Sequence, residues 1–455
     1  MKIDDFIFRA YDIRGYHATN LVPEVAEVLG RAYIALTGAK RISLGWDMRE
    51  TSPGLVEGFI KGVTSMGAEV IKIGMCTTPM IYYSVGMYDD IDGGVMVTAS
   101  HSTAEWNGIK MTRGDLSPIG KGSGMEELKE LAQAGEFNLS DTPGSVSERD
   151  IKKDFLDKLF AYTGEIDASK MTIVADAGNG VTPVILPKFF ERLGSNTVDM
   201  YWKPDGSFPN HEANPLKLDT LVDMQKSVLE NGAAFGVAYD ADGDRVGFVD
   251  ENAKYVPSDI VATMIALEML KKNPGAKILC DVRCTRDVKR VVEKNGGEYA
   301  MSPVGHAYIK QQMRKEGALF AGELSGHFYY AEMFMVESTL LSTMLIVKLM
   351  NETGKKLSEL VSEIRTHEQS GEINYVVRDK DATMKSLRDY HAEKGGKVSD
   401  LDGYTVSFDT WWFNIRPSAN DPVLRLNVES ETAEEMEIKR DEIIAMIESD
   451  GGELE

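Results

Sequence analysis

ISLGWDMRETSPGLVEGFIKGVTSMGAEVIKIG, residues 42–74, decides the fold of this chain. The stretch begins with an apolar run, turns at Asp47 and Arg49, and continues with apolar residues at helical spacing. It then stops at a glycine near 67 and ends in a second apolar run. This order predicts a strand, a polar turn, a helix and a parallel strand. Such βαβ units build largely parallel sheets with right-handed crossovers.

The same pattern occurs twice more. Residues 172–200 place Asp176 and a Gly-Asn-Gly turn after the first strand, and residues 277–300 place Asp281 and Arg283 there. Three repeats predict three domains of like topology. Alternating strands at 373–379, 403–417 and 423–430 then predict a smaller α+β domain at the end of the chain. The predicted fold is therefore α/β, with three similar mixed α/β domains and a C-terminal α+β domain around a central cleft.

Loop-forming residues suggest where these domains meet. The run SDTPGSVS at 140–147 and the polar stretch at 251–257 are typical of linkers. We expect domains at 1–147, 148–252, 253–366 and 367–455. An amphipathic helix over 257–272, with Ser258 as N-cap and Asp259 in the first turn, opens the third unit, and an apolar helix over 338–350 closes it.

Composition excludes several classes of function. The chain has 455 residues and a formal net charge of −22, which argues against binding to nucleic-acid backbones. Its three cysteines have no pairing or metal spacing, so we expect buried thiols in a reduced compartment, the cytoplasm. The N-terminus lacks an apolar signal core, and no apolar run is long enough to predict a membrane span. No obligate protein partner is evident.

Each repeat leads into a second strand that ends in a polar loop. These strand and loop sequences are VMVTASHS (95–102), AFGVAYDADGDR (234–245) and ALFAGELSGH (318–327). Loops at equivalent positions of three similar domains can face one cleft. Ser100 would thus lie outside the carboxyl end of a strand, where α/β sheets carry chemistry.

The second loop predicts a metal site. Asp240, Asp242 and Asp244 can turn three carboxylates around one hard cation, and oxygen ligands of this kind favour Mg²⁺. A calcium EF-hand loop is the competing interpretation, because Glu251 stands at the twelfth position. Arg245 at the sixth position, where that loop needs glycine, and the strand-like flanks argue against it.

The other loops offer groups for a phosphorylated sugar. Glu323, Ser325 and His327 can bond hydroxyls, and His306 is a second candidate imidazole. Arginines, a hydroxyl and an amide in residues 416–429 are typical of a phosphate-binding site. The chain has no Walker A or GxGxxG sequence, so nucleotide binding has little support. Ser100 and His101 should face apart, because they are adjacent, and form no hydrolase dyad.

Five ordered motifs together resemble one family. FRAYDIRG (8–15), TASHS followed by NGIK (98–110), DADGDR, GELSGH and RPSANDPVLRLNVE (416–429) are similar to those of the α-D-phosphohexomutases, close to the bacterial phosphomannomutase/phosphoglucomutase group. The resemblance covers essentially the whole chain. It implies a four-domain enzyme in which phosphorylated Ser100 exchanges its phosphoryl group with a hexose phosphate through a hexose 1,6-bisphosphate.

The resemblance also implies residue roles. Mg²⁺ would be held by Asp240, Asp242, Asp244 and a phosphoserine oxygen at Ser100. Arg245 and Lys110 would stabilise the transferring phosphoryl group, and His101, Lys110 and Arg14 are candidates for proton handling. The substrate-binding positions would be Tyr11, Arg283, His306, Glu323, Ser325, His327, Arg416, Ser418, Asn420 and Arg425.

The chain departs from the family pattern at three places. Ser102 and Thr103 replace Asn-Pro, which predicts a less rigid loop; residues 418–422 replace SNTEP; and Arg283 stands where Lys is frequent. GELSGH is nearer to the GEMSGH form of the mannose and glucose enzymes than to GEQSGH, the form associated with phosphoglucosamine mutase. One apolar residue carries this distinction, so phosphoglucosamine mutase is the alternative. A non-catalytic sugar-phosphate-binding homologue and a metal-dependent phosphatase are rivals from other classes.

Overall fold

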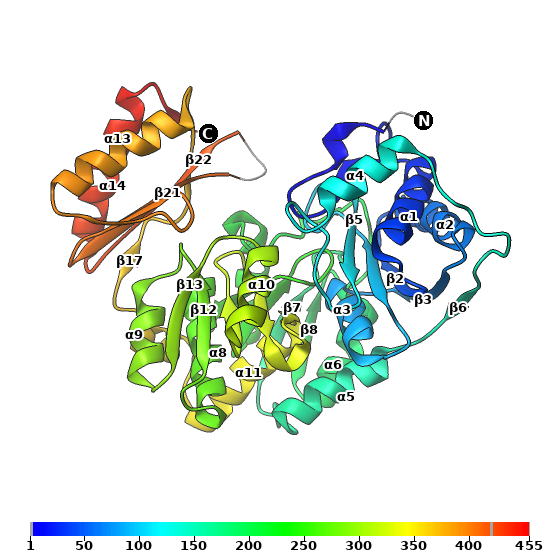
Figure 1. Ribbon diagram of the computed structural model, residues 1–455. Helices are drawn as coiled ribbons and strands as arrows, with labels where there is room; N and C mark the ends of the chain where they lie inside the picture. The colour runs from blue at the N-terminus through cyan, green and yellow to red at the C-terminus, as the bar shows by residue number, and fades with distance from the viewer. Residues whose placement is uncertain (1–2, 419–421, 455) are drawn as a thin grey trace.

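The first domain of the computed structural model, which describes residues 3–418 and 422–454, is a six-stranded sheet between helices (Figure 1). Its strand order is β1-β5-β4-β2-β3-β6. Packing against one face are α1, α2 and α4, and α3 packs against the other. The bounds are β1 Ile13–Tyr16, α1 Pro23–Thr37, β2 Arg41–Trp46, α2 Ser52–Ser65, β3 Glu69–Met75, α3 Thr78–Met87, β4 Gly93–Val97, β5 Trp106–Arg113, α4 Met125–Ala134 and β6 Val146–Glu148.

The second and third domains each carry a five-stranded sheet, with orders β11-β10-β9-β7-β8 and β13-β12-β14-β15-β16. The second contains α5 Lys152–Thr163, β7 Thr172–Asp176, α6 Leu186–Leu193, β8 Asn196–Met200, α7 Val222–Asn231, β9 Phe235–Tyr239, β10 Val246–Asp250 and β11 Tyr255–Val256. The third contains α8 Ser258–Lys272, β12 Lys277–Asp281, α9 Arg286–Lys294, β13 Glu298–Ser302, α10 His306–Glu316, β14 Phe320–Gly322, β15 Phe328–Tyr330, β16 Val336–Glu337, α11 Thr339–Thr353 and α12 Leu357–Ile364.

One topology recurs in these three sheets, as the sequence pattern predicts. The first strand of each repeat, β2, β7 or β12, pairs in parallel with both neighbours. The second of these two neighbours in chain order, β4, β9 or β14, also pairs antiparallel with the strand that follows it in the chain. The three polar loops all lie at that reversal, which brings them to the same place in each domain.

The C-terminal domain is built differently. Every pairing in its sheet is antiparallel, with β22 at the centre, and α13 and α14 pack against the sheet (Figure 1). The bounds are β17 Glu368–Gln369, β18 Ile373–Val376, α13 Lys380–Glu393, β19 Lys397–Ser399, β20 Tyr404–Ser407, β21 Trp411–Pro417, β22 Leu424–Ser430, α14 Ala433–Ser449 and β23 Glu453–Leu454. This domain is the predicted α+β unit.

The cores are divided unequally. One cluster of buried side chains runs from α3 of the first domain through the second domain to α8 and α11 of the third. The helices α1, α2 and α4 of the first domain pack in a second cluster, and the C-terminal domain has a core of its own. The first three domains are thus packed as one body, and the fourth is joined to them by a short segment and by polar contacts.

Several local predictions need correction or refinement. Ser258 is not an N-cap: Pro257 occupies that position, no side chain caps the helix there, and the Ser258 hydroxyl contacts that of Tyr255 at 3.3 Å. The helix is also not amphipathic, because it is buried on nearly all sides by α9, α11 and α12. The end of the FRAYDIRG motif belongs to β1, Ile13–Tyr16. The apolar helix begins at Thr339 and extends to Thr353.

The cysteines behave as predicted. Cys76, Cys280 and Cys284 are buried and free. Within the described ranges, no helix combines the length and apolar character needed to span a membrane. The division at 147, 252 and 366 stays a prediction, although β6 extends the first sheet across residue 147.

The contact between α1 and α2 depends on glycine. A Cβ at Gly62 would lie 2.1 Å from the Glu27 carbonyl oxygen, whereas one at Gly54 meets only Pro23 Cγ at 3.4 Å. We expect Gly62→Ala to lower the free energy of unfolding in urea by about 2–3 kcal/mol through overpacking. The matched control Gly54→Ala should raise it by up to about 1 kcal/mol, because alanine is the better helix former. Equal effects of the two substitutions would contradict this account of the packing.

Candidate active site

The Ser100 loop is held in a strained shape by a buried arginine. Ser100 has φ of 50°, and its N–H donates to Thr98 Oγ1 at 2.9 Å. Arg49, from the loop after β2, donates to the carbonyls of Ser100, Ser102, Thr103 and Trp106 at 2.6–3.0 Å. These bonds restrain the loop at Ser102 and Thr103, the two positions where the sequence departs from the motif that it resembles. Arg49 is itself paired with Asp47 at 3.1 Å. The sequence pattern placed Arg49 only in a polar turn.

The positive φ of Ser100 overturns one prediction. Ser100 Oγ lies 3.2 Å from His101 Nδ1, so the two side chains face the same way. Adjacent residues face apart in extended backbone, and the left-handed conformation of Ser100 removes that alternation. Burial, with the nearby charges of Arg245 and Arg14, lowers the pKa of His101, so its ring is neutral.

The three aspartates of the second loop converge. One carboxylate oxygen from each of Asp240, Asp242 and Asp244 lies within 4.8 Å of the others. Asp240 Oδ1 accepts the backbone N–H groups of Asp244 and Arg245, both at 3.0 Å, and Asp240 Oδ2 accepts the Ser100 hydroxyl at 3.0 Å. The strands β9 and β10 flank this loop, which excludes the helical EF-hand arrangement.

Lys110 compensates part of this negative charge. Its ammonium lies 2.7 Å from Asp242 Oδ2 and 2.5 Å from Asp244 Oδ2. Burial would lower the pKa of Lys110, but the two carboxylates raise it well above its usual range. Asp242 Oδ1 is buried and has no hydrogen-bond partner among the described residues. An oxygen ligand in that state fits a hard cation. Burial and the neighbouring Asp244 and Asp242 raise the pKa of Asp240.

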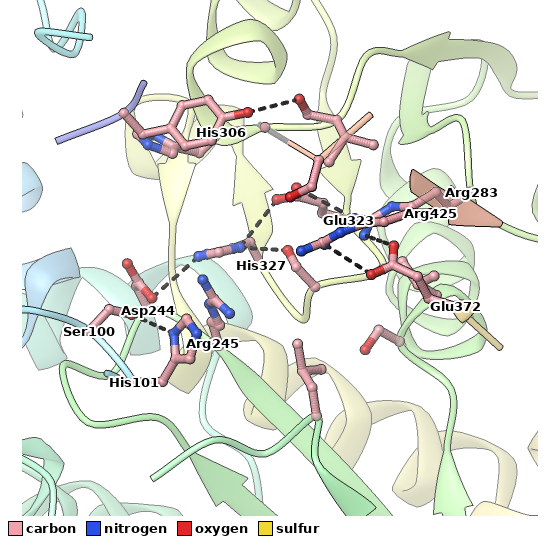
Figure 2. A pocket seen from close by; sticks show the side chains of 18 of the residues that line it. Ser100, His101, Asp244, Arg245, Arg283, His306, Glu323, His327, Glu372 and Arg425 are labelled. Carbon is pink, nitrogen blue, oxygen red and sulfur yellow. Dashed lines mark hydrogen bonds and ion pairs between the residues drawn. The ribbon is translucent and has the colours of Figure 1, made fainter. Parts of the chain in front are cut away.

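The third loop places a charged histidine between two carboxylates, as Figure 2 shows. His327 Nε2 lies 3.3 Å from Asp244 Oδ1, and His327 Nδ1 lies 3.2 Å from Glu323 Oε2. Burial opposes protonation, but Asp244 and Glu323 raise the pKa of His327 to about 9. Ser325 Oγ lies 2.7 Å from His327 Nδ1, and Tyr329 donates to Glu323 at 2.9 Å.

Residues of the first domain also reach the third. The Tyr11 ring lies 5.2 Å from that of His306, and its hydroxyl would be 2.7 Å from a Cβ at Gly305, so this approach requires glycine there. Arg14 donates to Asp12 at 2.7 Å and to Ser102 Oγ at 3.1 Å. Burial lowers the pKa of His306 well below its usual value, so the ring is neutral.

Three arginines gather at the other side of the cavity around Glu372, and two of them, Arg283 and Arg425, are labelled with it in Figure 2. Arg283 follows β12, and Arg416 and Arg425 face each other in the register of β21 and β22. All three pair with the Glu372 carboxylate at 2.9–3.2 Å. No sequence motif pointed to Glu372, because its contacts join segments about 40 to 90 residues apart in the chain.

One cavity of about 1050 Å³ collects these groups. It is lined by fifteen of the predicted site residues, namely Tyr11, Arg14, Ser100, His101, Lys110, Asp244, Arg245, Arg283, His306, Glu323, Ser325, His327, Arg416, Ser418 and Arg425. Asp240 and Asp242 lie buried beneath Ser100 and Lys110. Asn420 lies outside the described residues. The cavity can therefore hold a ligand with anionic groups at both ends and hydroxyls between them.

Comparison with known proteins gives matches over nearly the whole chain. Four models of the phosphoglucomutase/phosphomannomutase family match: α/β/α domain I at 5–139, domain II at 153–254, domain III at 257–367 and the C-terminal domain at 372–446.

Individual relatives agree with these matches. The phosphomannomutase of Methanocaldococcus jannaschii is 37% identical, over 98% of both chains. That of Salmonella montevideo is 35% identical, over 97% of this chain and 99% of the other. A crystal structure of a phosphoglucomutase/phosphomannomutase family protein from Burkholderia thailandensis superimposes with a TM-score of 0.90 at 28% identity, over 99% of both chains.

The free energy of unfolding tests whether Arg49 holds the Ser100 loop. Arg49→Met removes the donor of four loop carbonyls and leaves Asp47 without its guanidinium, so we expect the free energy of unfolding to fall by about 3 kcal/mol. Arg41→Met removes exposed ion pairs with Glu69 and Asp90 and should leave it nearly unchanged. Urea denaturation followed by circular dichroism measures both. If Arg49→Met were as stable as the wild type, Arg49 would not hold the loop.

Proposed function

The chain belongs to the phosphoglucomutase/phosphomannomutase family, and on that premise we propose that it is a phosphohexomutase that interconverts hexose 1-phosphate and hexose 6-phosphate. Its sugar is mannose, glucose or both. One observation carries the proposal: a serine beside three aspartates and a lysine shares its cavity with a cluster of arginines. A hexose bisphosphate needs two such anion-binding ends.

We propose that Ser100 carries a phosphoryl group in the resting enzyme. The free hydroxyl of a bound hexose phosphate attacks this phosphorus, the bond to Ser100 Oγ breaks, and the hydroxyl proton is lost. The product is a hexose 1,6-bisphosphate. After the sugar reverses in the cavity, Ser100 Oγ takes the other phosphoryl group and releases the isomeric hexose monophosphate.

The donor set beneath Ser100 fits Mg²⁺. Asp240, Asp242 and Asp244 offer only oxygens, and the unpartnered Asp242 Oδ1 is a ligand atom without another role among the described residues. With a phosphoserine oxygen they would hold the ion, which would offset negative charge on the transferring group. Three protein carboxylates leave coordination positions for that oxygen.

Two kinds of residue surround the phosphoryl group. Lys110 and Arg245 are cationic and would stabilise the charge that spreads over the equatorial oxygens, with Arg14 beside them. His101 is neutral and lies next to Ser100 Oγ, so it is the group best able to accept and return the proton.

The remaining residues would orient the sugar and its distal phosphate. Glu323 and Ser325 can bond ring hydroxyls, and the protonated His327 can donate to them. Tyr11 and His306 would close the side of the cavity. The distal phosphate would be bound by Arg283, Arg416, Ser418, Asn420 and Arg425.

The alternatives have less support. Relatives at 35–37% identity are named phosphomannomutase, which does not favour phosphoglucosamine as the substrate. A non-catalytic binding protein or a phosphatase would need no returned phosphoryl group on Ser100. We expect the protein to work on small hexose phosphates in the cytoplasm, without nucleic acid or an obligate protein partner.

Ser100→Ala tests the phosphoserine mechanism. The wild type should convert mannose 1-phosphate and glucose 1-phosphate to their 6-phosphates, and the variant should lose at least about 10³-fold in kcat, because the phosphoryl carrier is gone. Intact-mass spectrometry should find one phosphoryl group on the wild type and none on the variant. Full activity of the variant would refute the mechanism, and a strong preference for glucosamine 1-phosphate would refute the substrate assignment.

Asp242→Asn tests the metal site. The amide keeps the size of the side chain but removes its charge, so we expect Mg²⁺ affinity to fall at least about tenfold. Isothermal titration of the full chain with MgCl₂ measures this directly. Asp250→Asn is a matched control, because Asp250 is buried at the other end of β10 from the loop. Equal Mg²⁺ affinity in wild type and Asp242→Asn would exclude this carboxylate as a ligand.

A further inference from the structure

The arginine cluster opposite Ser100 is organised by one carboxylate. Glu372 immediately precedes β18, in the short connection between β17 and β18 of the fourth domain. Its Oε2 lies 3.2 Å from Arg283 Nη1 and 3.2 Å from Arg416 Nη2, and its Oε1 lies 2.9 Å from Arg425 Nη1. All four side chains line the cavity, and Figure 2 shows Arg283 and Arg425 converging on Glu372. Glu372 thus accepts bonds from guanidinium groups of two domains.

The three arginines depend on Glu372 to different degrees. Arg283 is already held by Asp281, through Nε at 3.0 Å and Nη2 at 2.8 Å. Arg416 is 4% exposed, and Glu372 is its one ion-pair partner within residues 3–418 and 422–454. Arg416 Nε, also buried, has no hydrogen-bond partner in those ranges. Arg416 therefore has a buried donor, Nε, that Glu372 does not bind and that an anion with more acceptor oxygens could bind.

The acceptors are shared unequally within the cluster. Arg283 has three carboxylates within 3.7 Å, those of Asp281, Glu323 and Glu372, whereas Arg416 and Arg425 share the one Glu372 carboxylate. Burial would raise the pKa of Glu372, but the three arginines lower it, so the carboxylate stays ionised. A phosphate group offers more acceptor oxygens and more negative charge than a carboxylate, and it suits paired guanidinium donors better.

We propose that the Glu372 carboxylate stands in for the distal phosphate of the substrate in the free enzyme, and that it yields Arg416 and Arg425 to that phosphate on binding. The proposal rests on the proposed function, since it takes a hexose phosphate as the ligand. Glu372 keeps its bond to Arg283, which Asp281 holds in place. The contact between the third and fourth domains then persists while the arginines change partners.

Glu372 positions the arginines and also lowers their affinity for phosphate. Without an anion, buried guanidinium groups would lose their orientation and pay a desolvation cost. With a competing carboxylate, a bound phosphate gains less, because it must displace an existing partner. A weaker grip is useful here, since a bisphosphate intermediate has to release this end and reverse within the cavity.

Glu372→Gln tests the proposal by anion binding, without turnover. The full-length variant should bind inorganic phosphate about three- to tenfold more tightly than the wild type in isothermal titration, because the competing charge is gone. Glu363→Gln is the matched control: it removes the same charge from α12, and its partner is Lys355, which is not among the residues that line the cavity. This control should bind phosphate as the wild type does.

Kinetics give a second readout. For Glu372→Gln we expect a lower KM for the hexose 1-phosphate together with a lower kcat, because the intermediate leaves the arginines more slowly. A purely structural role of Glu372 would raise KM instead. Phosphate binding that is unchanged or weaker in Glu372→Gln, or equally tightened in Glu363→Gln, would overturn the proposal.

A third measurement uses the wild type alone, in case the variant does not fold. In crystals soaked with inorganic phosphate, the anion should lie on Arg416 and Arg425, with Glu372 bonded to Arg283 only. Phosphate elsewhere, with all three Glu372 contacts kept, would overturn the proposal. These outcomes are independent of the mutase assignment, because neither phosphate titration nor soaking requires turnover.

Discussion

The buried repulsion among Asp240, Asp242 and Asp244 is the constraint on which the rest of this structure depends. Three carboxylates within 4.8 Å cannot remain ionised in a protein interior unless cations and donors surround them. The first domain supplies Lys110 and the hydroxyl of Thr78, which donates to Asp242 at 2.6 Å. The third domain supplies His327, and its Thr339 hydroxyl bonds the loop carbonyl of Gly243. The acidic loop therefore draws three domains together, and the site forms only where they meet.

Much of this arrangement follows from sequence, because it depends on local order along the chain. The βαβ repeat at 42–74, 172–200 and 277–300 fixes where each polar loop emerges, so Ser100, the aspartates and Glu323 could be placed in one cleft before any contact was known. Predictions that needed exact backbone geometry were less successful. Ser258 missed the cap position by one residue, and the left-handed φ of Ser100 turned His101 toward it.

Contacts between distant segments were beyond sequence reasoning for a different reason. Arg49 is an ordinary residue of a polar turn until β5 brings the carbonyl of Trp106 to it. Glu372 resembles any loop glutamate until Arg283, Arg416 and Arg425 converge on it from two domains. No periodic pattern in the sequence predicts such contacts, because they arise from the packing of whole domains. Only a general chemical rule applies to such residues: a buried arginine requires hydrogen-bond acceptors, and the sequence does not say which segments supply them.

The cavity also explains how an acidic protein can bind an anionic substrate. Net charge sets the long-range field, but binding is decided by local groups at both ends of the cavity. At each end the cations are held by carboxylates, Lys110 by Asp242 and Asp244, and Arg416 by Glu372. Such partners lower the cost of burying a cation, and they also compete with the ligand for it. Because the fourth domain has its own core, its arginines can exchange partners without disturbing the packing of the other three. The separation of cores thus lets the distal end be strong enough to orient a phosphate and still release it.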